Sequence, residues 1–214
     1  MFCPCKNKII SGFTAFLLLL SVNSGLLQAA ERSVILVMGD SLSAAYNIPV
    51  SAGWVSLLEQ RLDKQANTDW QVINASISGE TTSGGLTRLP SLLRQHQPDL
   101  VLLKLGANDG LRGLPPKHIS NNLEKMLTLS KQKSAKVILI GILLPLNYGP
   151  AYSTRFEQIY PELAKKHQLP LVPFLLEGIA DKPGLMQADG LHPTAEAQPE
   201  ILETVWLELK PLLN

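Results

Sequence analysis

Five short apolar runs separated by stretches with helical spacing constrain the fold of this chain more than any other feature. The runs cover residues 34–38, 70–73, 100–103, 137–140 and 169–172. Most of them lack polar alternation, which is typical of strands buried on both faces of a parallel sheet. Helices are expected between and after them at about 53–64, 86–96, 119–133, 155–167 and 198–209. This alternation predicts an α/β sandwich with right-handed crossovers.

Composition limits the class of protein further. The 214 residues are 45% hydrophobic, and 19 basic residues face 18 acidic ones for a net charge of +1. The length suits one domain, and the apolar content argues against disorder. Without a basic excess there is nothing to neutralise a row of phosphates, so we expect no nucleic-acid partner.

The first thirty residues differ from the rest. Lys6 and Lys8 precede an apolar stretch that begins at Ile9, and the segment closes on the small residues Ala29 and Ala30. A basic start, an apolar middle and a small-residue exit predict a secretory signal peptide over 1–30, cleaved near Ala30.

The alternative to cleavage is an uncleaved membrane anchor over 9–27. Seven Ser, Thr, Asn and Gly residues make that stretch a weak span, so we expect no stable membrane insertion after cleavage. The mature domain would then be 31–214. Both cysteines, Cys3 and Cys5, lie in the leader, so the mature chain would have no disulfide and no cysteine nucleophile.

Polar blocks follow the apolar runs, where parallel sheets bind ligands. Ser41 lies three residues beyond the first run, and a serine needs a base to become a nucleophile. Among the four histidines, His192 stands out because Asp189 precedes it by three residues in a glycine-containing turn. Such a turn can place the carboxylate on Nδ1 and leave Nε2 facing the serine.

A serine hydrolase also needs donors for the developing oxyanion. The candidates are the Ser41 N–H, the Gly79 N–H and the Asn108 side-chain amide, each following an apolar run. The structural alternative for Gly79 is an ordinary turn glycine, and that for Asn108 is a turn residue or helix cap. Asp109 is interpreted as a structural hydrogen-bonding residue, and His96, His118 and His167 as surface residues.

Several other motifs are missing from the chain. There is no G-x-S-x-G elbow, no P-loop, no G-x-G-x-x-G after a strand and no H-E-x-x-H. A flavin site would need a phosphate-binding loop after the first run, where Asp40 would repel phosphate. The sequence therefore contains none of these nucleotide-binding or zinc-protease motifs.

The blocks around Ser41, Gly79, Asn108 and His192, in this order, resemble the GDSL or SGNH hydrolase family. The G-D-S-L string, G-x-N-D at 106–109 and D-x-x-H at 189–192 are intact. The resemblance spans the mature chain and is strongest to periplasmic members with thioesterase and lysophospholipase activity. It implies a three-layer, flavodoxin-like α/β/α fold with a five-stranded parallel sheet.

The resemblance also implies the chemistry. The triad would be Ser41, His192 and Asp189, acting through an acyl-enzyme, with an oxyanion hole of Ser41, Gly79 and Asn108. Substrates would be acyl thioesters, carboxylic esters and lysophospholipids, hydrolysed without metal or cofactor. The enzyme is expected to be a monomer in the periplasm of a Gram-negative bacterium.

An acyl groove is expected from apolar residues that follow the strands, with ordinary core packing as the alternative. They are Leu111, Leu114, Ile142, Leu144, Pro145 and Tyr148. Residues 110–115 match a mobile loop that closes over acyl chains in the related enzymes. Ala107 and Ala45 stand where glycines are usual in those relatives.

Two rival functions remain open. One keeps the chemistry and changes the substrate, a carbohydrate O-acetylesterase of the same family. The other is a non-catalytic, flavodoxin-like binding protein with a degenerate site, against which the intact blocks argue.

Overall fold

A parallel sheet of five strands in the order β2-β1-β3-β4-β5 forms the centre of the protein. The computed structural model describes residues 1–2, 32–65 and 69–213. The strands are β1 Ser33–Gly39, β2 Trp70–Asn74, β3 Leu100–Lys104, β4 Lys136–Ile140 and β5 Leu171–Val172. The first four coincide with the predicted apolar runs to within a residue at each end.

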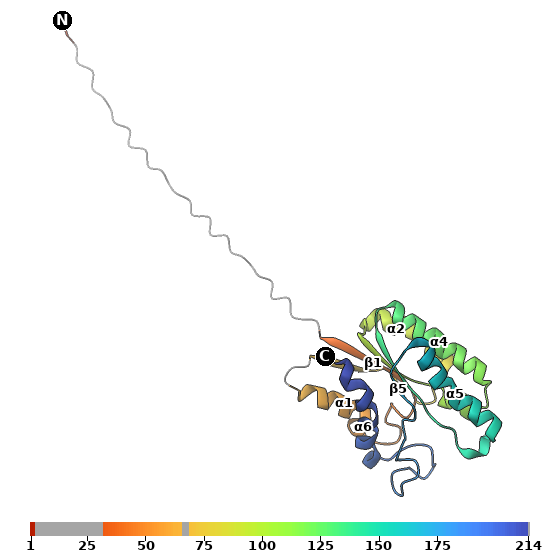
Figure 1. Cartoon of the computed structure of the whole chain (residues 1–214). Helices are drawn as coiled ribbons and strands as arrows, with labels where there is room; N and C mark the ends of the chain where they lie inside the picture. Colours follow the sequence, from red (N-terminus) through yellow and green to blue (C-terminus); the bar gives the residue numbers. More distant parts are fainter. Residues whose placement is uncertain (3–31, 66–68, 214) are drawn as a thin grey trace. The chain divides into compact units, whose positions relative to one another are not determined.

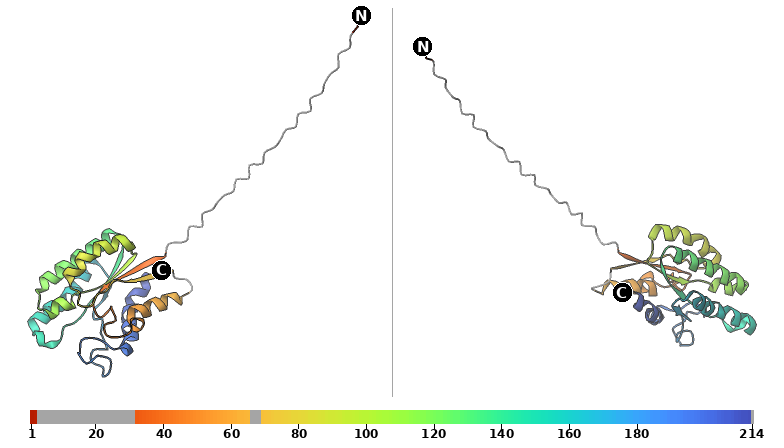
Figure 2. Two further views of the ribbon diagram at one scale, coloured as in Figure 1. Left: turned by 180° about the vertical axis from the view of Figure 1, so that it is seen from behind. Right: turned by 45° about the horizontal axis from the view of Figure 1, so that its top comes forward.

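Helices cover both faces of this sheet. They are α1 Trp54–Asp63, α2 Thr82–His96, α3 Ala107–Leu111, α4 Pro116–Gln132, α5 Pro150–His167 and α6 Gln198–Leu209. Short 3-10 helices lie at Val50–Ala52, Leu146–Tyr148, Ala195–Ala197 and Lys210–Leu212. Helices α1 and α6 pack on one face and α2, α4 and α5 on the other (Figures 1 and 2). The predicted three-layer α/β/α sandwich is confirmed.

Burial of the central strands explains why the sequence folds in this way. All five residues of β3 and the last five of β1 are buried, so both strands are covered on both faces. Ile35 pairs with Leu100 in register, and both are fully buried. Removing this apolar surface from water stabilises the layered arrangement by roughly 25 cal/mol per Å².

The fifth strand is shorter than predicted, which corrects the expected range of 169–172. The Leu169 N–H donates to the Ala164 carbonyl at 2.9 Å and so closes the end of α5. Pro170 has no N–H, and only its carbonyl joins the sheet by accepting from Leu139 at 3.1 Å. Regular pairing therefore begins at Leu171.

Several helices begin earlier than their apolar spacing indicated. Helix α2 begins at Thr82, because the Thr81 side chain accepts the Gly84 N–H at 3.2 Å as an N-cap. Pro116 and Pro150 occupy the first turns of α4 and α5. The five-residue helix α3 was not predicted at all.

The strand order places the carboxyl ends of β1 and β3 side by side. From β1 the chain crosses to β2 at one edge and then returns to β3 on the other side of β1. Connections that leave in opposite directions open a crevice between the two strand ends, where α/β sheets bind ligands. Ser41 follows β1 and Asn108 follows β3, so both lie at this point.

The expected leader over 1–30 lies outside the described residues, apart from Met1 and Phe2. The chain divides into two units, one over Met1–Glu31 and the other over Arg32–Asn214. In the described part of the chain, no helix combines the length and apolar character needed to cross a membrane.

Candidate active site

The turn that carries Ser41 is held from inside the protein. The Asp40 carbonyl accepts the N–H groups of Ser43 and Ala44, both at 3.0 Å, and the Asp40 carboxylate accepts the Leu42 N–H at 3.1 Å. Gly39 leaves no space for a side chain, because an added Cβ would lie 2.8 Å from Ser43. The chain can therefore turn sharply out of β1 and present Ser41.

Trp54, the first residue of α1, braces the same turn from the other side. Its indole Nε1 donates to the Leu42 carbonyl at 3.1 Å, and its backbone N–H donates to the Gln198 side chain at 3.0 Å. Trp54 is fully buried. The nucleophile turn is thus tied to both helices on that face of the sheet.

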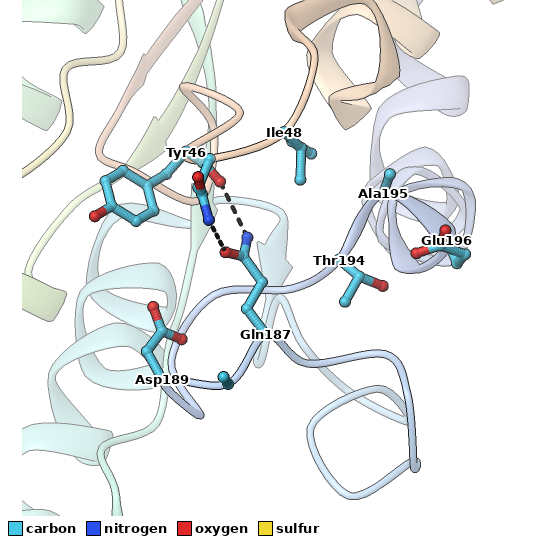
Figure 3. A pocket seen from close by; sticks show the side chains of 9 residues that line it. Tyr46, Ile48, Gln187, Asp189, Thr194, Ala195 and Glu196 are labelled. Carbon is cyan, nitrogen blue, oxygen red and sulfur yellow. Dashed lines mark hydrogen bonds between the residues drawn. The ribbon is translucent and has the colours of Figure 1, made fainter.

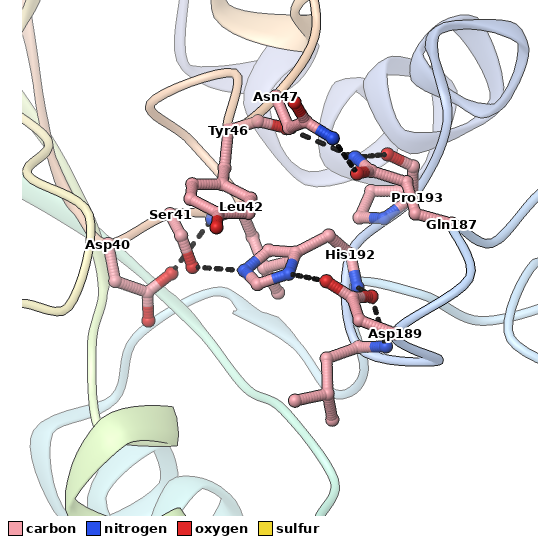
Figure 4. Close-up of polar contacts among 10 residues, drawn as sticks. Asp40, Ser41, Leu42, Tyr46, Asn47, Gln187, Asp189, His192 and Pro193 are labelled. Carbon is pink, nitrogen blue, oxygen red and sulfur yellow. Dashed lines mark hydrogen bonds and ion pairs between the residues drawn. The ribbon is translucent and has the colours of Figure 1, made fainter.

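Ser41, His192 and Asp189 form one chain of hydrogen bonds (Figure 4). His192 Nε2 lies 2.8 Å from Ser41 Oγ, and His192 Nδ1 lies 2.7 Å from Asp189 Oδ2. The second Asp189 oxygen accepts the N–H groups of Leu191 at 2.9 Å and His192 at 3.0 Å. The structure therefore brings these three residues together across 151 positions of sequence.

The carboxyl of Asp189 is kept in its charged form. Burial alone raises its pKa, but hydrogen bonds from the His192 ring and from the His192 and Leu191 N–H groups outweigh that effect. The pKa falls from 3.8 to about 2. The carboxylate is therefore available to orient the ring and to stabilise a positive charge on it.

Of the candidate oxyanion donors, Ser41 and Gly79 lie in turns and Asn108 lies in a short helix. Gly79 has φ +80°, and an added Cβ would meet nothing within 4 Å, so the conformation and not the space favours glycine there. Asn108 lies in α3, and its Nδ2 donates to the Glu80 carbonyl at 3.0 Å. That bond links the amide to the Gly79 turn and leaves the second Nδ2 hydrogen for a ligand.

A pocket of about 590 Å³ opens beside the Ser41–His192 pair. Its lining is Ser41, Leu42, Ala107, Asn108, Leu111, Ile142, Leu143, Leu144, Pro145, Phe174, Leu176, Ala180, Asp181, Met186, Gly190, Leu191 and His192. Most of these side chains are apolar, and the polar ones include Ser41, His192 and Asn108. Such a cavity accommodates an apolar chain whose reactive end lies at Ser41.

Four of the six residues expected in the acyl groove line this pocket, whereas Leu114 and Tyr148 do not. Tyr148 instead donates its hydroxyl to the Leu111 carbonyl at 2.8 Å. The Leu114 carbonyl accepts the Tyr152 hydroxyl at 2.7 Å. Tyrosines from the segment after β4 therefore hold the backbone of the loop after β3.

The pocket also contains residues that sequence reasoning missed. Phe174, Leu176, Met186 and Leu191 come from the segment that follows β5. They could have been found from the sequence, because residues that follow each strand were expected at the site. That expectation was not applied to the apolar residues after the fifth strand. Gly79, by contrast, lies outside the lining.

The segment with His192 is fastened by Gln187 (Figures 3 and 4). Its Nε2 donates to the carbonyls of Tyr46 at 3.0 Å and Pro193 at 2.9 Å, and its Oε1 accepts from Asn47 at 3.0 Å. The Tyr46 ring lies 4.3 Å from the His192 ring, centre to centre. These contacts join the two turns that carry the serine and the histidine.

A second hollow of about 550 Å³ lies on the far side of these contacts (Figure 3). It is lined by Tyr46, Asn47, Ile48, Gln187, Ala188, Asp189, Thr194, Ala195 and Glu196. Ala45 and Asn47 beside it have φ values of +55° and +57°. Ala45 therefore takes a left-handed conformation that favours glycine.

The other polar residues singled out in the sequence lie elsewhere. Asp109 is fully buried and accepts both the N–H and the hydroxyl of Thr82, at 2.8 and 2.6 Å. His118 contacts Ser83 at 3.2 Å, and His167 contacts Glu124 at 3.1 Å. Within the ranges that the structure describes, no group of three or more His, Cys, Asp and Glu residues could hold a metal ion.

Sequence reasoning also missed a buried ion pair beneath the nucleophile turn. Lys104 at the end of β3 lies 2.7 and 2.8 Å from the two carboxylate oxygens of Asp40. The predicted strand stopped at residue 103. A lysine next to an apolar run usually indicates a strand end that is exposed to solvent. Only the β1–β3 register places Lys104 beside Gly39 and so beside Asp40.

Comparison with known proteins identifies the family. A model of the GDSL-like lipase/acylhydrolase family matches residues 37–198. An arylesterase of Vibrio mimicus is 54% identical over 85% of this chain and 90% of its own. The thioesterase 1/protease 1/lysophospholipase L1 of Escherichia coli K12 is 46% identical over 87% of this chain and 88% of its own.

A solved structure agrees with this assignment. The psychrotrophic esterase EstA from Pseudoalteromonas, inhibited by monoethylphosphonate, is 43% identical with a TM-score of 0.80, over 85% of this chain and 99% of that one. The chain described here belongs to the GDSL-like lipase/acylhydrolase family.

Proposed function

We propose that this protein is a serine esterase and thioesterase that hydrolyses acyl esters, acyl thioesters and lysophospholipids through an acyl-enzyme. The observation that carries the proposal is the hydrogen-bonded chain Ser41–His192–Asp189 at the mouth of an apolar pocket. Relatives named arylesterase and thioesterase/lysophospholipase support the substrate class.

The first half-reaction forms the acyl-enzyme. His192 Nε2 takes the proton of Ser41 as Oγ attacks the acyl carbonyl, and the carbonyl becomes an oxyanion. The Ser41 and Gly79 N–H groups and the Asn108 amide are the proposed donors to that oxyanion. The tetrahedral intermediate then expels the alcohol or thiol, which takes the proton from Nε2.

The second half-reaction releases the acid. Water enters in place of the leaving group, gives a proton to His192 Nε2 and attacks the acyl carbonyl on the same face. Collapse of the second intermediate returns that proton to Ser41 Oγ and frees the carboxylic acid. Asp189 holds the ring and stays charged throughout.

The pocket favours acyl chains longer than acetyl. A cavity of about 590 Å³ lined by leucine, isoleucine, phenylalanine and methionine buries methylene groups, each worth about 0.8 kcal/mol. An acetyl group would use little of this surface, which argues against the carbohydrate O-acetylesterase alternative. Octanoyl esters should therefore have a higher kcat/KM than acetyl esters of the same alcohol.

Export and assembly are part of the proposal. The leader pattern of residues 1–30 supports secretion to the periplasm of a Gram-negative bacterium, with cleavage near Ala30. All three triad residues come from one chain, so a monomer suffices for catalysis. Mass determination of the secreted protein tests the cleavage, and gel filtration tests the monomer.

Replacement of the proposed nucleophile tests the activity. S41A should lower kcat/KM for p-nitrophenyl octanoate and octanoyl-CoA by at least about 1,000-fold. S130A is the matched control, because Ser130 in α4 only donates to the Met126 carbonyl of its own helix. If S41A kept wild-type rates on both substrates, the proposal would be wrong.

A further inference from the structure

The ion pair between Lys104 and Asp40 is buried directly beneath the candidate nucleophile. The exposed fraction of the side chain is 0% for Lys104 and 1% for Asp40, and Nζ contacts both carboxylate oxygens. Asp40 is the residue before Ser41, and its Oδ1 also accepts the Leu42 N–H. The pair therefore touches the backbone on either side of the serine.

General stability does not account for such a pair. Taking two charges out of water costs several kcal/mol per ion, and an apolar pair of similar volume is often as stable or more so. Burial lowers the pKa of Lys104, whereas the Asp40 charge and hydrogen bond raise it, so the ammonium depends on its partner. What the pair provides is local, a carboxylate that shapes the turn and a cation that cancels its charge.

Among the residues that the structure describes, the other buried titratable groups are Tyr160 and Asp109, and neither is basic. From α5, the Tyr160 hydroxyl donates to the Leu105 carbonyl at 3.0 Å, and its pKa is raised by burial and by Asp40 and Asp109. Asp109 in α3 is fully buried, and its contacts are hydrogen bonds from Thr82. Lys104 is the one buried basic residue in the described part of the chain.

An uncompensated Asp40 would oppose catalysis. In the proposed mechanism a negative charge develops on the acyl oxygen beside the Ser41 N–H. A second negative charge on the adjacent residue, buried and unscreened, repels it strongly in a medium of low dielectric. The same carboxylate is needed to accept the Leu42 N–H, so its charge must be balanced by a partner.

We infer that Lys104 is a positioning residue for Ser41: it neutralises Asp40 so that this carboxylate can hold the nucleophile turn without opposing the oxyanion. The inference rests on the proposed function. Lys104 acts through Asp40 and touches no substrate, since neither residue lines the pocket.

Charge removal in two steps tests this role. K104M keeps the apolar stem and leaves Asp40 unpaired, and it should lower kcat for p-nitrophenyl octanoate by about 30- to 100-fold with little change in KM. The second-order rate of Ser41 labelling by a fluorophosphonate should fall by a similar factor. The amide oxygen of D40N can still accept the Leu42 N–H. The double variant D40N/K104M should therefore have a kcat at least about ten-fold higher than that of K104M.

A merely structural role gives a different result. It would lower the melting temperature of K104M. The kcat per active site, counted by fluorophosphonate labelling, would stay at the wild-type value, and adding D40N would not change it. K166M is the control, because Lys166 pairs with Glu124 at the surface far along α5 and its loss removes the same charge. K166M should label at the wild-type rate.

Failure of the inference is separable from failure of the proposed function. Wild-type protein that is not labelled at Ser41 would contradict the proposed function. Labelled wild-type protein together with an unaffected K104M would contradict only the role of Lys104. If K104M does not fold, D40N/K104M carries the test: a rate within about ten-fold of wild type supports the role, and a folded double variant slowed more than 100-fold contradicts it.

Discussion

The two halves of the candidate site are held in opposite ways. Ser41 follows β1, whose last five residues are buried, and its turn is fixed by the Asp40–Lys104 pair and by the Trp54 indole. His192 lies in the segment 173–194, which contains no helix and no strand of the sheet, and whose one ladder contact is the isolated bridge between Met186 and Pro193.

The two triad side chains in the His192 segment are also more exposed to solvent than those around the nucleophile turn. The side chain of Asp189 is 39% exposed and that of His192 is 18% exposed, whereas Asp40 and Trp54 are fully buried. The segment depends instead on a few side-chain bonds, mainly those of Gln187 to the turn beyond Ser41. The core thus positions the nucleophile, and local hydrogen bonds position its base.

This difference has a consequence for mutations. Truncation of the apolar side chains that pack against the nucleophile turn should appear mainly as lost stability, because it leaves a cavity in the core. Changes in the His192 segment should appear mainly as lost rate, because an error of about 1 Å in the base can cost as much as 100-fold.

Trp54→Ala should destabilise the protein by about 3–5 kcal/mol, the range for truncating a buried aromatic side chain. It removes a fully buried ring together with the bond to the Leu42 carbonyl. Urea denaturation followed by circular dichroism measures the change. Trp206→Ala on the partly exposed face of α6 is the control and should cost less. A loss below 1 kcal/mol for Trp54→Ala would contradict a nucleophile turn held by the core.

Gln187→Ala should lower kcat by about ten-fold and the unfolding free energy by only about 1 kcal/mol. The side chain makes two hydrogen bonds that tie the His192 segment to the turn after Ser41, with Tyr46 and Asn47, and a third to Pro193 within that segment. Steady-state kinetics and urea denaturation on the same preparation check the split. Gln60→Ala on the exposed face of α1 should leave both quantities unchanged. Equal kcat with a large loss of stability would reverse the assignment of the two regions.

Asp189 should contribute a small, pH-dependent stability. Its pKa is about 2 in the folded protein and 3.8 as the ordinary value, so the folded state favours the charged form. That contribution is present above about pH 4 and is lost as the pH falls through 2. Because the side chain is 39% exposed, solvent limits it to under about 1 kcal/mol. The urea midpoints of wild type and D189N should converge between pH 5 and pH 2.5, and a constant difference would contradict the charge-based origin.

Much of the fold could be predicted from the sequence because buried parallel strands are continuous apolar runs. Runs such as 100–103 need no tertiary information to be recognised. The short helix α3 was missed since three of its five residues, Asn108, Asp109 and Gly110, are poor helix formers. The start of β5 was predicted two residues too early because the Leu169 N–H is used by α5.

For the candidate site, the sequence supplied the residue types and their order along the chain. Asp189 and His192 are three residues apart, so their turn could be inferred locally. The distance from Ser41 to His192 could not, because it depends on segment 173–194 folding back over the sheet. Lys104 and Gln187 escaped for the same reason, as each acts through a partner far away in sequence.

The central claim is that Ser41 is the nucleophile and that His192 activates it. Incubation with an alkyl fluorophosphonate, followed by tryptic mass spectrometry, tests it directly, since a related esterase structure is described as inhibited by a phosphonate. We predict a single adduct on the peptide that contains Ser41, no adduct in S41A, and labelling of H192A slowed by at least about 1,000-fold. An adduct on another residue, or equal labelling of wild type and S41A, would contradict the account.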